Sequence, residues 1–344
     1  MMKKVMKKII PNFLLAASLA MTTSHAYAGQ TLRFAHFWPS TSAVHNEIFD
    51  TWAKSVEKAS GGELKVNLYP SQTLLKAAQS YDGTVNGIAD ITATVQGYSA
   101  GRFPLSEITQ LPGITESALQ GACILQTLYD TGKIDQEYND THVLFMFTTG
   151  PAYLHTSKKE IKTPNDLIGL RMRRPNEVTG ALLAQMGASP VGIPAPGIYE
   201  AMERGVVDGL SFPFEAMKVF RINDLSNYHL QIPYASGIFV ATMNKRTYDR
   251  LTPEMKTVID EHSGMEWAMK AAQVFNRLDQ EGLQEAKAQG DTIHVVNDPL
   301  NNPDWGSPLK EGTERYLERI EKNGKTTARE VYQTAFGLRE QCAS

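Results

Sequence analysis

A strand–helix–strand pattern near the start of the chain restricts the fold more than any other feature. The segment 31–37, TLRFAHF, and the segment 64–69, LKVNLY, alternate side chains as half-buried strands do. Between them a helical pattern runs until Ser60-Gly61-Gly62, with apolar residues at Ile48, Phe49, Trp52 and Val56. Strand, helix and strand in fewer than 40 residues form a βαβ unit. The chain is therefore predicted to have an α/β fold with a mainly parallel sheet.

The segments 81–90, YDGTVNGIAD, and 199–208, YEAMERGVVD, share one spacing. Each places glycine six and aspartate nine residues after tyrosine, and each leads into a β-type segment. A helix that ends in glycine and is followed by a strand thus occurs in both halves of the chain. Because the chain is also longer than one ordinary core requires, we predict two domains of similar build. Ligands of such sheets bind beyond the carboxyl ends of the strands.

A long helix is predicted in the second half of the chain. From Pro253 to about Gln289 the pattern is helical, with Gly264 and Gly282 as the only interruptions. Thr252 is a favourable N-cap, followed by proline at the first helical position. At 1.5 Å per residue this helix would reach roughly 50 Å, enough to brace two domains. Further strand patterns occur at 141–149, 169–175 and 236–244; the last two are candidates to line or cross the space between the domains.

The first 28 residues have the three parts of a secretory signal peptide in the expected order. Lysines come first, an apolar segment runs from Ile9 to Met21, and Ala26-Tyr27-Ala28 matches a cleavage site before Gly29. The alternative, a membrane anchor, needs roughly 20 apolar residues, and this segment is shorter. No later segment is apolar enough to cross a bilayer. We predict cleavage after Ala28, export to the periplasm, and a mature protein that does not insert into the membrane.

Charge and cysteine content indicate which partners and which cellular compartment suit the protein. Cleavage would remove four lysines and no acids, so the formal net charge would go from 34 − 37 = −3 to 30 − 37 = −7. A chain this acidic is a poor binder of nucleic acid. Cys123 and Cys342 both survive cleavage, and an oxidising compartment permits a disulfide between them. The sequence leaves this pairing open, because it does not give the distance between their Cα atoms.

Signatures of catalysis are missing from the sequence. It contains no H-E-x-x-H and no P-loop, and two cysteines do not make a zinc knuckle. Its histidines have no spacing that suggests paired metal ligands. We therefore expect binding without turnover, and neither a metal nor a cofactor. A periplasmic hydrolase or isomerase and a purely structural protein are the alternatives from other classes.

The chain resembles the periplasmic solute-binding proteins of tripartite ATP-independent periplasmic (TRAP) transporters, the DctP type. The resemblance covers nearly all of the mature chain and depends on the combination and order of its segments: LRFAHFWPSTS, GGELKVNLYPSQTL, VNGIADI, GRFPLSEITQLPGI, IKTPNDLIGLRMRRPN, MGASPVGIP, YEAMERGVVDG and RLTPEMKTVID. It implies the Venus-flytrap fold of periplasmic binding proteins, with two α/β domains around a cleft and a long helix across both. The implied domains are 29–149 with about 237–275, and 150–236 with about 276–344.

The resemblance also implies partners. Members of this family bind a small organic acid and deliver it to membrane permease subunits driven by an ion gradient. Most act as monomers, and we expect a monomer here. The alternatives are a binding protein for an ABC importer and one for a sensor kinase.

The segment 169–176, GLRMRRPN, carries the most specific implied residue. In this family such a strand presents the arginine of its R-x-P motif to the ligand carboxylate, and that arginine is Arg173 here. Strand alternation places Arg171 and Arg173 on one face, and Arg173 lies nearest the Pro-Asn breaker. A guanidinium matches a carboxylate through two parallel hydrogen bonds. Arg171 and Arg174 are expected to be surface charges or structural ion pairs.

The remaining candidates give the pocket an aromatic character. Relatives that bind sialic acid have a second arginine where this chain has Tyr153 and an asparagine where it has Phe212. Further candidates are Phe37 and Trp38 in the first loop, Phe214, Ser236 near a hinge, and Thr94, Gln96 and Tyr98 at a strand end. One anion-binding group among aromatic rings indicates a monocarboxylate with an apolar, aromatic or cyclic body. An ectoine-like zwitterion and a dicarboxylate are the alternative ligands.

Overall fold

The computed structural model describes residues 29–343, so the predicted signal peptide and its cleavage site lie outside the described residues. Within that range no helix is both long and apolar enough to cross a membrane. One mixed sheet forms the centre of the molecule. Its strands are β1 (Gln30–His36), β2 (Leu64–Tyr69), β3 (Ile91–Val95), β4 (Thr141–Thr156), β5 (Arg171–Arg174), β6 (Ser189–Gly192), β7 (Gly209–Phe212), β8 (Tyr228–Asn244) and β9 (Thr292–Val295).

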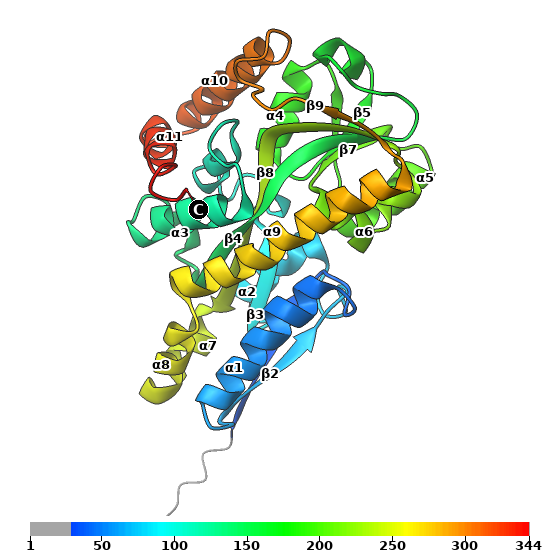
Figure 1. Ribbon diagram of the computed structural model, residues 1–344. Helices are drawn as coiled ribbons and strands as arrows, with labels where there is room; N and C mark the ends of the chain where they lie inside the picture. Colours follow the sequence, from blue (N-terminus) through cyan, green and yellow to red (C-terminus); the bar gives the residue numbers. More distant parts are fainter. Residues whose placement is uncertain (1–28, 344) are drawn as a thin grey trace, which may run out of the picture.

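The order of the strands divides the sheet into two similar halves. It runs β2-β1-β3-β8-β4-β7-β5-β6, with β9 paired to β8. In the first half β1 pairs in parallel with β2 and β3, and in the second half β5 pairs in parallel with β6 and β7. The antiparallel strands β4 and β8 belong to both halves (Figure 1). The predicted α/β fold of a two-domain periplasmic binding protein is confirmed.

The strands β4 and β8 are longer than the sequence predicted. They contain 16 and 17 residues, because both continue through glycine-containing segments that ended the sequence pattern. The pairing shifts register between Thr148 and Pro151, beside Gly237. The predicted domain boundaries, at 149/150 and 236/237, fall at this irregularity; movement of the two domains relative to each other stays a prediction.

The helices lie on both sides of the sheet. They are α1 (Thr51–Ala59), which continues a π-helical turn at Val44–Asp50, α2 (Ser80–Val85), α3 (Ala118–Asp130), α4 (Glu177–Gln185), α5 (Ile198–Glu203), α6 (Phe214–Val219), α7 (Lys245–Asp249), α8 (Pro253–Glu261), α9 (Gly264–Gln289), α10 (Gly306–Lys322) and α11 (Ala328–Gly337). In Figure 1, α9 runs diagonally across β4 and β8, from α7 and α8 to the region of α5 and α6.

The long helix is shorter than predicted at its start. The helical pattern from Pro253 is divided into α8 and α9, because Gly264 adopts a φ of 70°, which a continuous helix does not permit. The 26 residues of α9 still extend about 39 Å. Gly282 does not interrupt this helix. A Cβ there would come within 2.4 Å of the Phe214 carbonyl oxygen, so glycine allows α9 to approach α6.

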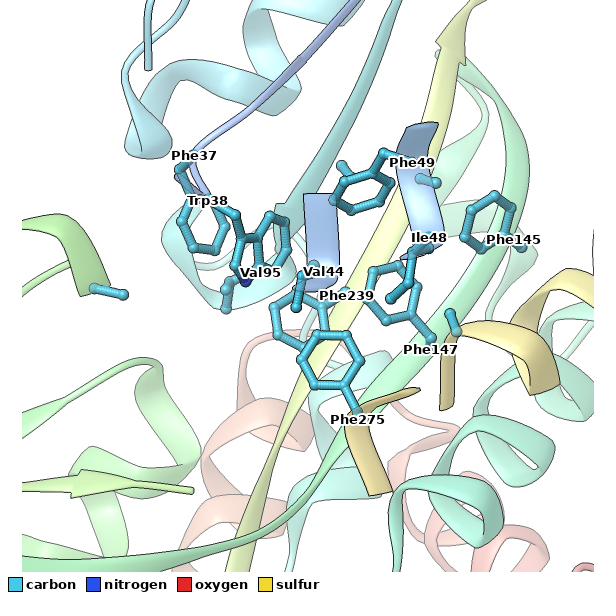
Figure 2. Packing of buried hydrophobic residues seen from close by; sticks show 14 of the residues in the cluster. Phe37, Trp38, Val44, Ile48, Phe49, Val95, Phe145, Phe147, Phe239 and Phe275 are labelled. Carbon is cyan, nitrogen blue, oxygen red and sulfur yellow. The ribbon is translucent and has the colours of Figure 1, made fainter. Parts of the chain in front are cut away.

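Aromatic side chains join the long helix to the central strands. Phe275 of α9 packs on Phe239 of β8, with 5.3 Å between ring centroids, and Phe239 stacks on Phe147 of β4 at 4.8 Å. Trp38, which follows β1, contacts the Phe239 ring from another side at 5.3 Å. Figure 2 shows these rings gathered where strands and helix meet. The hydrophobic core therefore extends to Phe37 and Trp38 after β1, which were predicted from the sequence to contact the ligand.

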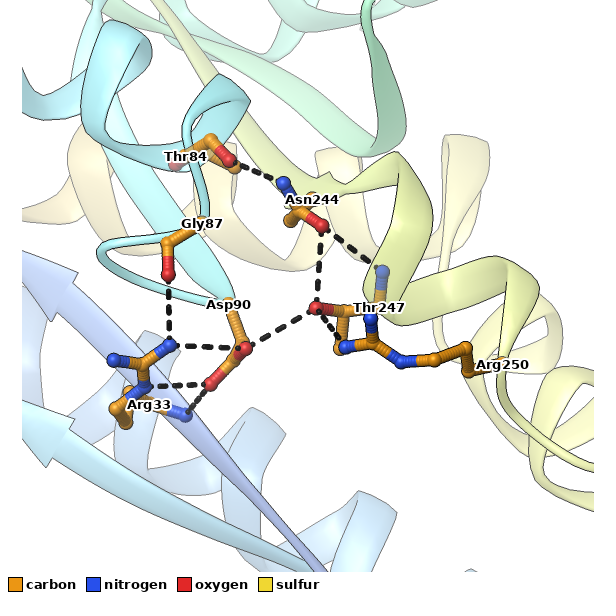
Figure 3. Close-up of polar contacts among 7 residues, drawn as sticks. All are labelled: Arg33, Thr84, Gly87, Asp90, Asn244, Thr247 and Arg250. Carbon is orange, nitrogen blue, oxygen red and sulfur yellow. Dashed lines mark hydrogen bonds and ion pairs between the residues drawn. The ribbon is translucent and has the colours of Figure 1, made fainter.

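Each half of the sheet contains the same arginine–aspartate pair. Asp90, before β3, accepts hydrogen bonds from the backbone N–H and the guanidinium Nε of Arg33, both at 2.9 Å (Figure 3). Asp208, before β7, accepts from the backbone N–H and Nε of Arg171 at 2.9 and 3.0 Å. The repeated tyrosine–glycine–aspartate spacing therefore corresponds to a repeated structure.

The cysteine pairing that the sequence left open is settled by the structure. Cys123 of α3 and Cys342, near the chain end, form a disulfide with their Cα atoms 5.7 Å apart. The bond closes a loop of 219 residues and attaches the segment after α11 to α3.

Candidate ligand-binding site

A cavity lies between the two halves, near the carboxyl ends of β1, β3, β5 and β7. This is where ligands of parallel sheets bind, because those ends of the strands meet. Its lining is mainly apolar. The residues are Phe37, Trp38, Val95, Tyr98, Thr149, Ala152, Arg173, Pro175, Ala195, Ser211, Phe212, Pro213, Glu215, Ala216, Phe220, Ser236, Gly237 and Phe239.

Arg173 is the one lysine or arginine among these lining residues. Its side chain is 1% exposed. Its Nε donates to the Ile193 carbonyl oxygen at 2.7 Å, and Nη1 donates to the Ser211 carbonyl oxygen at 3.0 Å. These bonds to the segment after β6 and to β7 hold the guanidinium in a fixed orientation at the end of β5.

No carboxylate forms an ion pair with Arg173 among residues 29–343, although the group is buried. Burial lowers the pKa of the guanidinium, and the nearby Tyr98 opposes this shift. Arginine nevertheless stays protonated in proteins. A buried cation without a counter-ion is costly, so this arrangement favours binding of an anion.

Tyr98 connects the two halves beside this cation. It lies just after β3, yet its hydroxyl oxygen accepts a hydrogen bond from the Ala195 N–H at 2.8 Å and from Arg173 Nη2 at 3.5 Å. Both partners belong to the second half of the sheet. Burial raises the pKa of Tyr98, so its hydroxyl keeps its proton at neutral pH. That proton has no acceptor within the described chain and is free for a ligand.

Aromatic rings from both halves form the walls of the cavity. Phe37 and Trp38 stack on each other with 3.9 Å between centroids, and both follow β1. On the opposite side, Phe212 lies under the Arg173 guanidinium at 5.1 Å and contacts Phe220 at 5.9 Å. Apolar rings facing one another beside a single cation suit a ligand with one charged end and a flat or apolar body.

Six of the ten sequence-predicted site residues line this cavity: Arg173, Phe37, Trp38, Tyr98, Phe212 and Ser236. The structure therefore brings together the predicted anion-binding residue and most of the predicted rings. The Ser236 hydroxyl has no hydrogen-bond partner among the described residues, although it is buried. It is thus a further polar group that a ligand could engage.

The other four predicted residues lie behind the lining. Tyr153 pairs with Phe212 across β4 and β7, and Phe214 packs on the Tyr153 ring at 5.3 Å. Gln96 is bound on both sides, donating to the Phe239 carbonyl oxygen at 3.2 Å and accepting from the Tyr138 hydroxyl at 2.7 Å. The Thr94 hydroxyl contacts the Ala77 carbonyl oxygen at 3.5 Å. These residues support the pocket wall and do not line the cavity.

Two lining residues, Glu215 and Phe220, were not predicted from the sequence. Both lie in or just after the short helix α6, for which no helix was predicted from the sequence. The strand end before Pro213 was the available signal, because residues after parallel strands gather at the ligand edge of a sheet. No group of three histidine, cysteine, aspartate or glutamate side chains within residues 29–343 could hold a metal ion.

The other two arginines of GLRMRRPN have partners. Arg171 is bound to Asp208, with Nη2 2.7 Å from Oδ1, and Arg174 is 2.8 Å from Glu177. Both were expected to be structural or surface charges, and the ion pairs confirm this. The three arginines therefore differ in one decisive respect, because only Arg173 lacks an acidic partner among the described residues.

Comparison with known proteins agrees with this architecture. Residues 34–318 match the family described as bacterial extracellular solute-binding protein, family 7 (DctP). The 2,3-diketo-L-gulonate-binding periplasmic protein YiaO of Escherichia coli strain K12 is 24% identical over 248 residues, covering 72% of this chain and 75% of YiaO.

Two solved structures are similar over most of their length. One is a marine metagenome TRAP solute-binding protein specific for aromatic acid ligands, in complex with 3-hydroxybenzoate; its TM-score is 0.85 at 30% identity, covering 92% of this chain and 99% of that one. The other, from Rhodoferax ferrireducens T118, contains copurified benzoate; its TM-score is 0.83 at 30% identity, covering 91% and 98%. The chain belongs to family 7 of the bacterial extracellular solute-binding proteins, the DctP-type solute-binding proteins of TRAP transporters.

Proposed function

We propose that this protein is the periplasmic receptor of a TRAP transporter and that it binds an aromatic or similarly apolar monocarboxylate through Arg173. One observation carries the proposal: a fully buried guanidinium that has no acidic partner within residues 29–343. A carboxylate is the natural counter-ion for such a group, because the two match in shape and charge.

The contacts of Arg173 leave donors for this carboxylate. A guanidinium has five N–H groups. The three contacts of Arg173 with the described residues use three of these groups, which leaves two for a ligand. The Tyr98 hydroxyl, 3.5 Å from Nη2, has a proton to donate at the same place. The ligand carboxylate would therefore accept hydrogen bonds from Arg173 and from Tyr98.

The remainder of the cavity favours an aromatic body. Its walls are rings, and a dicarboxylate or a sugar acid would find no second cation among the described lining residues. The two similar structures at 30% identity were solved with 3-hydroxybenzoate and benzoate, which supports the same ligand class here.

Binding would hold the two halves together and so signal that the receptor is loaded. Tyr98 belongs to the first half and Arg173 to the second, so a carboxylate held by both has its full set of contacts only when the halves are closed. The moving bodies would be the predicted domains, 29–149 with about 237–275 and 150–236 with about 276–344. The closed form would then deliver the acid to the membrane permease subunits.

Calorimetry with benzoate and 3-hydroxybenzoate tests the role of Arg173. Arg173→Ala should weaken binding by about 2–5 kcal/mol, roughly 30- to 5,000-fold, because a buried carboxylate would lose its partner. Arg171→Ala is the matched control, two residues earlier on the same strand, and should change affinity less than twofold. Binding by Arg173→Ala within twofold of wild type would contradict the proposal.

Tyr98→Phe tests the second donor. The variant keeps the ring and loses the hydroxyl, and the same titrations should show a loss of about 1.5–3 kcal/mol, the size of one hydrogen bond to a charged group. Unchanged affinity would remove Tyr98 from the proposed carboxylate site and leave Arg173 in place.

Location and assembly have simple tests. Mass spectrometry of protein from a periplasmic extract should give a mature chain that begins at Gly29. Light scattering should give the mass of a monomer. A chain that starts elsewhere, or a dimer mass, would correct these parts of the proposal.

A further inference from the structure

Glu215 is a second ionisable side chain in the cavity that the proposed carboxylate site does not use. It is the second residue of α6 and is 6% exposed. Its Oε2 is buried and has no hydrogen-bond partner among the described residues. A buried polar atom without a partner is rare and costly, so it indicates a group that is completed by something other than the chain.

The surroundings of Glu215 favour the neutral form of its carboxyl group. Burial raises the pKa of Glu215 well above its ordinary value, and the charge of Asp279 raises it further. Asp279 accepts a hydrogen bond from the Glu215 backbone N–H at 3.2 Å, and burial raises the pKa of Asp279 to about 6. No lysine or arginine forms an ion pair with Glu215 among residues 29–343. The protonated form that this shift favours has one O–H donor as well as acceptor oxygens.

Glu215 and Arg173 are anchored on different elements. Glu215 lines the ligand cavity and also the outer groove formed with Pro39, Ser42, Lys218 and Glu285. Its backbone N–H is bound to Asp279 of α9, whereas the Arg173 guanidinium is bound to the carbonyl oxygens of Ile193 and Ser211. The two side chains therefore approach the cavity from different supports.

We propose that Glu215 determines specificity: its carboxyl group hydrogen-bonds a hydroxyl or carbonyl oxygen on the body of the ligand, away from the carboxylate held by Arg173. This inference rests on the proposed function. It narrows the ligand class from aromatic monocarboxylates in general to those with a polar substituent. A bare aromatic acid would leave the buried Glu215 oxygen without a partner, and such a mismatch is where binding sites discriminate most strongly.

Titration of benzoate and of the 2-, 3- and 4-hydroxybenzoates tests this, because these probes differ by one hydroxyl group. The wild-type protein should bind at least one hydroxybenzoate more tightly than benzoate, by roughly 5- to 150-fold. Glu215→Leu should reduce that preference to less than about threefold. Glu215→Gln, which can still donate and accept, should retain part of it.

Glu281→Leu is the matched control. Glu281 lines only the outer groove and is paired with Arg277 at 2.7 Å, so this variant should keep the wild-type preference. Thermal unfolding of each variant, with and without 3-hydroxybenzoate, separates loss of fold from loss of preference.

The outcomes separate the two proposals. A wild-type protein that binds all four acids equally, or a Glu215→Leu variant with the wild-type preference, would overturn the role of Glu215 and leave the role of Arg173 standing. If none of the four acids binds to the wild-type protein, the proposed ligand class itself fails, and the role of Glu215 fails with it.

Discussion

The two halves of the sheet can be compared residue by residue. Arg33 of β1 and Arg171 of β5 occupy equivalent positions, and each binds the aspartate that precedes the third strand of its half, Asp90 or Asp208. Gly87 and Gly205 end the preceding helices with φ values of 75° and 65°. Only glycine adopts this backbone conformation without strain, so the frame is the same in both halves.

The halves differ two residues after the paired arginine. The first half has Ala35, which is 1% exposed, and the second has Arg173, also 1% exposed. The register of the strands shows the equivalence, since Ala35 lies opposite Thr92 of β3 and Arg173 opposite Leu210 of β7. An arginine paired with an aspartate therefore belongs to the repeated frame of each half. A buried arginine without an acidic partner occurs, among the described residues, in the second half alone. What an arginine does here depends on its partner.

The largest expected effect concerns elements outside the repeated frame. α10 and α11 follow the second half, and the disulfide attaches the residues beyond them to α3. Cys123→Ser with Cys342→Ser should lower the free energy of unfolding by about 3–5 kcal/mol, because the closed loop is long. Urea unfolding of this variant and of the oxidised wild type measures the difference. A loss below 1 kcal/mol would mean that packing of α11 holds the chain end without the bond.

The fold could be predicted from the sequence where local pattern decides it. The βαβ unit and the tyrosine–glycine–aspartate repeat were visible because both consist of short-range spacing. The continuation of β4 past Gly150 and Pro151 was not, since pairing with β8 overrides the local breakers. The break at Gly264 was missed because its neighbours favour a helix.

The site could be predicted less completely than the fold. Arg173 was identified through a family motif. Which of the residues after β3 would face the ligand depends on the direction of their side chains, and the sequence does not give that direction. Gln96 is bound within the first half, and Tyr98, two residues later in a turn, reaches the cation. Glu215 gave no signal because its character comes from burial by distant elements, which a sequence pattern does not contain.

The two arginine–aspartate pairs offer the next test. Asp90 also accepts a hydrogen bond from the Thr247 hydroxyl at 3.2 Å and has a side chain 12% exposed, whereas the Asp208 side chain is 35% exposed. Asp90→Ala should lower the free energy of unfolding by up to about 3 kcal/mol, since it leaves the buried Thr247 hydroxyl and the partly buried Arg33 N–H groups without their acceptor. Asp208→Ala should cost less. Urea unfolding of the two variants measures this difference. A larger loss for Asp208→Ala than for Asp90→Ala would contradict the expectation that the more buried pair contributes more.

His36 follows Ala35 in the first half, as Arg174 follows Arg173 in the second. The pH dependence of stability tests this difference between the halves. Burial, followed by the charge of His45, lowers the pKa of His36 to about 3, so this side chain is neutral in the folded protein. The unfolded chain binds a proton near pH 6.5, and the stability from His36 is therefore present above that pH and lost as pH falls. Between pH 7 and 5 the free energy of unfolding should fall by about 2 kcal/mol more in wild type than in His36→Gln.

Arg174, at the equivalent place in the second half, provides the control for this pH dependence. It is paired with Glu177, and histidine is the side-chain type that ordinarily changes charge in this pH range. Arg174→Gln should therefore show the wild-type slope. Equal slopes for wild type and His36→Gln would mean that His36 is accessible to protons in the folded state.

The smallest expected effect lies at the surface of the repeat. Ile88 and Val206 each follow the repeated tyrosine by seven residues, and they are 48% and 47% exposed. Ile88→Ser and Val206→Ser should each change the free energy of unfolding by less than about 0.5 kcal/mol, because exposed side chains have little packing to lose. Thermal unfolding of the two variants side by side measures this. A cost above about 1 kcal/mol at one position alone would show that the equivalence of the two halves ends at the frame and does not reach the surface.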